Sequence, residues 1–272
     1  MINCYRFEKI NFKNGLFDES VDATYILHLE GNGRIESIRE QLLLYQPSKI
    51  VYILFNKGFT KCNKHDKINT TAIDIVDANM SVFEHAQTNK YNNVLILEDD
   101  FIFNMKIKEQ NHANNINTFI LKHQSERMIY LLGTLPILQM PYDINTNIAY
   151  SVGTHAVIYT KSIREQMLTR TIMDIDEYHN INSRKYIYYI PLCYQLFPDT
   201  ENSANWGNDL GYLYKISVVS TAKTLFKYLK LDTQIEPGYT LFYKFSKIIF
   251  WILLLFIIFV IYYLITTNIN EN

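Results

Sequence analysis

The sequence predicts an α/β domain followed by one C-terminal transmembrane helix. Short apolar runs without polar alternation are separated by segments of helical periodicity, which is typical of a parallel sheet covered on both faces. Near the C-terminus, the run 248–265 (IIFWILLLFIIFVIYYLI) contains no charged residue, no Gly and no Pro. As a helix this run would extend about 27 Å, close to the hydrocarbon thickness of about 30 Å.

Composition excludes several classes of protein. The chain has 272 residues, 48% of them hydrophobic, and a formal net charge of -1. A disordered chain would be poorer in apolar residues, and a nucleic-acid binder is usually strongly basic. The three cysteines (Cys4, Cys62 and Cys193) are too few and too scattered for a disulfide framework or a CxxC zinc site.

The N-terminal half is expected to alternate strands with helices. Apolar residues recur at helical spacing from Ile35 to Tyr45, and Pro47 would stop that helix. We expect strands at 24–29, 50–55, 72–76 and 93–97, and helices at 35–45 and 80–90. This order implies parallel pairing through crossover helices.

The pattern is looser in the C-terminal half. Residues 162–165 (SIRE) match a capping box, which predicts a helix to about Arg170. Residues 194–211 are loop-like. We expect further helices at 114–124 and 174–180, and strands at 128–132, 149–153, 155–160 and 186–190. An apolar stripe (Val219, Ala222, Phe226, Leu229) beside lysines either lies on an anionic membrane surface or packs on the domain.

These patterns divide the chain into an α/β domain (1–218), a basic juxtamembrane segment (219–247) and a transmembrane helix (248–267). Residues 1–30 hold no apolar signal segment, so we expect tail anchoring after synthesis. Lys244 and Lys247 flank the N-terminal side of the span, which predicts a single-pass protein with most of the chain in the cytosol. A glycan on the sequon 69–71 (NTT) would instead place the domain in the lumen.

Three adjacent carboxylates, Glu98, Asp99 and Asp100, follow the strand expected at 93–97. Adjacent carboxylates repel one another unless a cation is present. Mg²⁺ and Mn²⁺ prefer oxygen ligands, and open α/β folds bind ligands at the carboxyl ends of their strands. The cluster therefore predicts a divalent cation that holds a phosphorylated substrate. The alternative is a solvated turn whose acids cap a helix.

The sequence resembles glycosyltransferase family 25, which includes lipooligosaccharide and collagen galactosyltransferases. The segment 93–101 (NVLILEDDF) resembles the LEDD core of that family. Other resembling segments follow in order: 24–34, 72–78, 130–133, 153–161, 174–178, and 189–195 with Ser203. The chain departs from the family at 27–30 (LHLE), where an Asn-Leu-basic run is usual, and only one arginine, Arg34, remains there. It also departs at Ser81 and His85, which are not adjacent.

The resemblance implies a GT-A-like, Rossmann-like domain that uses a nucleotide-sugar donor, with a UDP-sugar favoured, and Mn²⁺ or Mg²⁺. Glu98, Asp99 and Asp100 would hold the metal, and Asp99 would also contact the donor. Arg34 would pair with the diphosphate, and Asp77 would approach the nucleotide. Asp176 would be the base of an inverting transfer.

Each of these roles has a structural alternative. Asp176 is equally explained as an acid in the first turn of a helix, Asp77 as a helix N-cap, and Arg34 as surface charge. His155 and His179 are possible third metal ligands, but a structural or solvated role explains each better, because no His spacing supports a metal site. Trp206 is a candidate for stacking on a sugar.

The leading hypothesis is a membrane-anchored glycosyltransferase that moves a hexose, galactose or glucose favoured, to a glycan, lipid-linked or protein acceptor. The main alternative is a catalytically degenerate scaffold of the same fold at the membrane. A phosphoryl or nucleotidyl transferase ranks lower, because the sequence has no P-loop. No nucleic-acid partner is expected. The sequence does not specify the sugar, the acceptor, the membrane or the oligomeric state.

Overall fold

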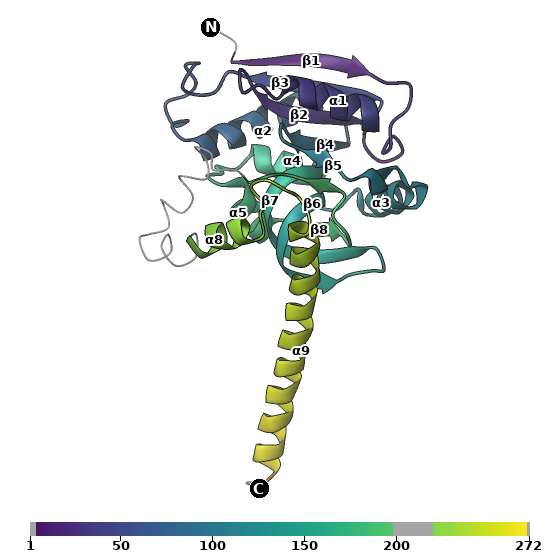
Figure 1. Ribbon diagram of the computed structural model, residues 1–272, viewed down its shortest axis with the longest axis vertical. Helices are drawn as coiled ribbons and strands as arrows, with labels where there is room; N and C mark the ends of the chain where they lie inside the picture. The colour runs from purple at the N-terminus through teal and green to yellow at the C-terminus, as the bar shows by residue number, and fades with distance from the viewer. Residues whose placement is uncertain (1–3, 198–219, 271–272) are drawn as a thin grey trace.

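The computed structural model describes residues 4–197 and 220–270, and Figure 1 shows a layered domain from which one long helix projects. Its described residues form a seven-stranded sheet in the order β1-β3-β2-β4-β7-β6-β8 and a two-stranded sheet, β5-β9. The strands are β1 (Tyr5–Asn11), β2 (Ala23–Leu29), β3 (Ile50–Asn56), β4 (Asn93–Glu98), β5 (Ile102–Phe103), β6 (Met128–Pro141), β7 (Thr146–Thr160), β8 (Arg184–Tyr188) and β9 (Cys193–Tyr194).

The central strands are parallel, as the sequence predicts. β2 pairs in parallel with β3 and with β4, and Leu27 lies opposite Glu98. The carboxyl ends of these strands therefore reach the same edge of the sheet. β1 adds an antiparallel edge strand beside β3. The sequence did not reveal β1, because its polar and apolar residues alternate, as is usual for a strand with one face toward water.

The other half of the sheet is antiparallel and its strands are longer than expected. β7 pairs antiparallel with β4 and β6, and β6 pairs in parallel with β8. β6 continues through Gly133, where we expected a strand to end, because register shifts let it bend without breaking. The two extended runs expected at 149–153 and 155–160 are one strand.

The strand expected at 72–76 is wrong, because these residues lie in helix α2 (Thr71–Thr88). The Thr70 side chain caps the helix by accepting a hydrogen bond from the Ile73 N–H. Short apolar runs do not distinguish a buried helix from a strand by periodicity alone. The capping box at 162–165 is also misplaced, since α4 (Lys161–Leu168) already begins after Thr160.

Helices cover both faces of the sheet, which confirms an α/β class with a mixed sheet. One apolar core joins the sheet to α1 (Ile35–Tyr45) and α3 (Gln110–His123). A second core joins the opposite face to α2, α4 and α5 (Ile175–Asn182). The short 3₁₀ helix η1 (Met105–Lys108) precedes α3.

Helix α9 (Gly238–Asn270) begins on the domain and then leaves it (Figure 1). The Gln139 side-chain amide of β6 donates to the Tyr243 carbonyl and to Ser246 Oγ, which fixes the first turns of α9. In α8 (Ser220–Tyr228), Phe226 is buried in a small core with Leu231, so this part of the apolar stripe packs on the domain. The segment Gly238–Thr267 is long and apolar enough to cross a membrane.

Candidate functional site

The three carboxylates lie where the parallel strands end. Glu98 is the last residue of β4, and Asp99 and Asp100 form the turn that follows. Their side chains are mostly covered, since Asp99 is 10% exposed and Asp100 is 19% exposed. This position at the edge of the sheet is where α/β folds commonly bind ligands. The burial argues against the alternative of a fully solvated turn.

Asp99 holds the loop that follows β2. Its Oδ2 accepts hydrogen bonds from the Leu29 N–H (3.0 Å) and from the Asn32 amide (2.5 Å). Its Oδ1 pairs with the Arg34 guanidinium at 2.5 Å, and His28 Nδ1 lies 3.5 Å from Oδ2. Burial alone would raise the pKa of Asp99, but interactions with His28 and Arg34 together lower it. Asp99 is therefore an ionised residue that positions Arg34.

Glu98 and Asp100 share one neutral donor. The Gln195 amide nitrogen lies 3.3 Å from Glu98 Oε2 and 3.1 Å from Asp100 Oδ2. Burial, together with the charges of Asp100, Asp176 and Asp99, raises the pKa of Glu98 to about 8. Burial also raises the pKa of Asp100, although Arg34 opposes that rise. Asp100 Oδ1 is buried and has no hydrogen-bond partner among the described residues. When both carboxylates are ionised, this end of the cluster therefore has more negative charge than its described neighbours compensate.

Asp176 lies in the first turn of α5, as its structural alternative predicts. Its charge also affects the pKa of the acidic cluster. Its Oδ2 accepts the Gly153 N–H at 2.9 Å, while its Oδ1 is buried without a described partner. Burial raises the pKa of Asp176, and the charge of Lys185 opposes that rise. Burial also lowers the pKa of Lys185 to about 8. Because the charge of Asp176 raises the pKa of Glu98, the two carboxylates belong to one electrostatic unit.

Asp77 lies in a different cluster. It accepts a hydrogen bond from the Tyr5 hydroxyl and lies 3.4 Å from Lys64 Nζ. Lys64 also pairs with Asp74 and donates to Asn56 Oδ1 at 3.0 Å, which ties the loop after β3 to α2. The structure does not bring Asp77 to the carboxylates of β4, and Thr70, not Asp77, is the N-cap. Contact with a nucleotide stays a prediction.

The two candidate histidines are buried and neutral. His155 Nε2 lies 3.2 Å from the Cys193 carbonyl oxygen, and burial lowers the pKa of His155 to about 4. Burial lowers the pKa of His179 well below its ordinary value. Within residues 4–197 and 220–270, no three His, Cys, Asp or Glu side chains are arranged to hold a metal ion. Ser203 and Trp206 lie outside the described residues.

Four residues at or near this site were not singled out for a role by the sequence. They are His28, Asn32, Lys185 and Gln195. His28 lies where the chain departs from the family pattern, and Gln195 ends the last resembling segment. The sequence therefore drew attention to both residues but did not predict a function for either. Asn32 and Lys185 gave none, because their positions depend on the loop after β2 and on the pairing of β6 with β8.

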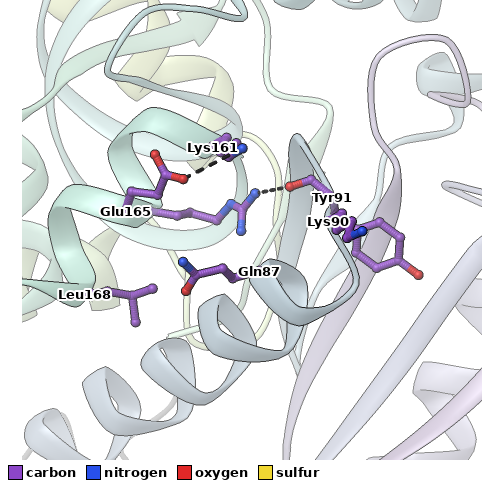
Figure 2. A pocket seen from close by; sticks show the side chains of 7 residues that line it. Gln87, Lys90, Tyr91, Lys161, Glu165 and Leu168 are labelled. Atoms are coloured by element: carbon purple, nitrogen blue, oxygen red, sulfur yellow. Dashed lines mark hydrogen bonds and ion pairs between the residues drawn. The ribbon is translucent and has the colours of Figure 1, made fainter.

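A small pocket lies away from this site, between α2 and α4 (Figure 2). Arg164 is buried there and donates to the Tyr91 carbonyl at 2.6 Å and to the Asn92 carbonyl at 3.1 Å. These carbonyls precede the first residue of β4, whereas the carboxylates follow its last. The pocket is thus at the opposite end of that strand, and Arg164 has the structural task of holding the strand's start.

No family model and no curated protein matches the chain. Two solved structures show a distant likeness. One is A197 from STIV, with 14% identity, a TM-score of 0.41, and coverage of 64% of this chain and 85% of that chain. The other is a glycosyltransferase involved in the glycosylation of the major capsid of PBCV-1, with 12% identity, a TM-score of 0.36, and coverage of 62% and 82% respectively. The resemblance to family 25 stays a prediction.

The raised pKa of Glu98 has a consequence for stability. Between about pH 5 and pH 8 the folded chain retains a proton on Glu98 that the unfolded chain loses. The free energy of unfolding of the metal-free protein is therefore expected to fall as the pH rises through this window. Denaturant titrations in detergent with a chelator would measure it. Glu98→Gln should flatten the dependence, and an unchanged slope in that variant would contradict the assignment.

Proposed function

We propose that the chain is a membrane-anchored glycosyltransferase that moves a hexose from a nucleoside-diphosphate sugar, with a UDP-sugar favoured, to a glycan, lipid-linked or protein acceptor. One observation carries this proposal. Glu98 and Asp100, at the carboxyl end of β4, share a single amide donor and have raised pKa values. Such a pair is stabilised by a cation, and the same edge of the sheet suits a phosphorylated donor.

The donor set fits Mn²⁺ or Mg²⁺. Both ions prefer oxygen ligands and leave coordination positions for substrate phosphates, so two protein carboxylates suffice. The unpartnered Asp100 Oδ1 supports this fit, and Glu98 would be the second ligand. When bound, the cation neutralises charge on the departing nucleoside diphosphate. Arg34, held by Asp99 and 3.1 Å from Asp100, would add a second positive charge beside the diphosphate.

Asp176 is the proposed general base of an inverting transfer. A base works best when its pKa approaches the working pH, and burial raises the pKa of Asp176 in that direction. The Gly153 N–H holds one carboxylate oxygen, so the other is left to accept a proton from the acceptor hydroxyl. The neighbouring charge of Lys185 opposes this rise in the pKa of Asp176, which favours the ionised form that a base needs.

Helix α9 is the proposed membrane anchor. Its apolar stretch is not buried against the domain, and Gly238–Thr267 is long enough to span a bilayer. The contacts of Gln139 with the first turns of α9 would hold the domain close to the membrane surface. An acceptor in or near that membrane would then be within reach of the site.

The test is donor turnover by the full chain in detergent, with Mn²⁺ and a panel of UDP-sugars. We expect Mn²⁺-dependent release of UDP with at least one donor. Asp176→Asn should lower turnover by about 10²- to 10⁴-fold, the usual contribution of a general base. Asp174→Asn is the matched control, because asparagine also caps a helix and Asp174 is exposed. Absence of UDP release with every donor would refute the proposal.

A scaffold function is the second candidate, and the ion pairs of Arg34 favour it. The guanidinium contacts both Asp99 and Asp100, so the chain itself supplies part of the positive charge that a metal would bring. Calorimetric titration with Mn²⁺ and UDP separates the two candidates. A transferase binds both ligands, whereas a degenerate scaffold binds neither.

A further inference from the structure

A disulfide joins Cys4 to Cys62. Cys4 directly precedes β1, and Cys62 lies in the loop after β3. The bond adds a covalent link to the antiparallel pairing of the edge strand β1 with its neighbour β3. Cys193, the third cysteine, is free and buried.

Disulfides form and persist in oxidising compartments and are rare in the cytosol. The Cys4–Cys62 bond therefore argues against the cytosolic placement that the flanking lysines predict. Protein disulfides outside the cytosol commonly accompany N-linked glycans, since both are added in the same compartment. The disulfide and a usable glycan acceptor are therefore two separate observations that point to the same compartment.

The lysine argument is weaker in the structure than in the sequence. Lys247 Nζ donates to the Tyr189 carbonyl at 2.9 Å and lies 5.9 Å from the centre of the Tyr189 ring. This lysine fastens α9 to the domain, a task that is the same on either side of the membrane. Of the two lysines nearest the span, Lys244 is the exposed one, and Lys227 and Lys230 add exposed charges further back along the chain. Three exposed lysines on one side of the span are a modest bias, which does not fix an orientation by itself.

The sequon 69–71 is placed where a glycan could be attached. Asn69 is exposed, in the loop between Cys62 and α2. Thr71 is the first residue of α2, and the neighbouring Thr70 provides the cap, so Thr71 is not needed for that cap. The chain also contains a contrasting sequon at 79–81 (NMS). Asn79 is only 3% exposed, lies inside α2 and donates to the Ile75 carbonyl, so it is not available in the folded domain.

We propose that the domain faces an oxidising compartment outside the cytosol and that Asn69 carries an N-linked glycan there. The inference takes α9 as a membrane anchor, as proposed above, but it does not depend on transferase activity. It names a modification site and reverses the orientation expected from the lysines and from the lack of an apolar signal segment in residues 1–30.

The test is translation of the full chain with endoplasmic-reticulum microsomes. We expect one endoglycosidase-sensitive shift in electrophoretic mobility and protection of the domain from added protease. Thr71→Ser keeps the sequon and should keep the shift, whereas Thr71→Ala removes the sequon and should abolish it. Asn79→Gln should leave the shift unchanged. Thiol alkylation before reduction should spare Cys4 and Cys62.

The outcomes separate this inference from the proposed function. A chain that resists carbonate extraction, lacks the shift and loses its domain to protease would overturn the inference and leave the anchor in place. A chain that carbonate extracts from the membrane and that carries no glycan would overturn both the inference and the proposed membrane anchor. A glycosylated, protected chain without donor turnover would support the inference and count against the transferase.

Discussion

Replacing Asp100 with asparagine is expected to lower Mn²⁺-dependent donor turnover by about 100-fold or more, because the proposed metal ligand then loses its charge. Asparagine keeps the size of the side chain and can still contact Gln195. Arg34 keeps its pairing with Asp99, so the loop after β2 should stay in place. The variant therefore changes the charge of the cluster more than its shape. Release of UDP at several Mn²⁺ concentrations would measure the effect.

The same variant carries its own control for folding. Removing one of two carboxylates that share a donor relieves repulsion, so the metal-free variant should be at least as stable as the parent near pH 8. A loss of turnover with unchanged or increased stability identifies a ligand, whereas a loss of both would indicate misfolding. Turnover that survives in Asp100→Asn would exclude Asp100 as a metal ligand.

The sequence predicts the parallel part of the sheet well, for a physical reason. Strands that are covered on both faces are continuously apolar, and 24–29, 50–55 and 93–97 show this plainly. The same criterion failed at 72–76, because a helix that is buried on one side can also begin with an apolar run. β1 was missed for the opposite reason, since an edge strand has a polar face.

The sequence predicts only the part of the site whose residues are adjacent in the chain. Glu98, Asp99 and Asp100 are adjacent in the chain, and the end of a buried strand fixes where they lie. Their partners come from distant segments: the loop after β2 supplies Arg34, and the segment after β8 supplies Gln195. Spacing in the sequence does not encode such contacts, which depend on strand order. The same strand order keeps Asp77 apart, since α2 holds it beside Lys64.

Gly133→Ala is expected to destabilise the domain by more than about 3 kcal/mol, at the upper end of the range for overpacking a core. A Cβ at Gly133 would lie 1.7 Å from the Cys193 carbonyl oxygen and 2.8 Å from His155 Nε2. The nearest atoms belong to the backbone, which cannot rotate away as a side chain can. Denaturant titration of the full chain in detergent would measure the loss.

Gly33→Ala is the matched control. Gly33 has a φ of +78° and no other atom within 4 Å of the added Cβ, so alanine there costs only the left-handed backbone conformation, about 1 kcal/mol. The two variants thus separate a backbone preference from a steric clash. Equal losses of stability in the two variants would show that the Cys193 backbone moves away without cost.

The effect of Gly133→Ala should extend to the acidic site. The Leu192 N–H donates to the Leu132 carbonyl, so the segment that carries Gln195 lies against β6 beside Gly133. Moving that segment would withdraw the amide that Glu98 and Asp100 share. Any Gly133→Ala protein that does fold should therefore be destabilised more strongly by rising pH than the parent. A folded variant with the parental pH dependence would show that Gln195 reaches the carboxylates independently of β6.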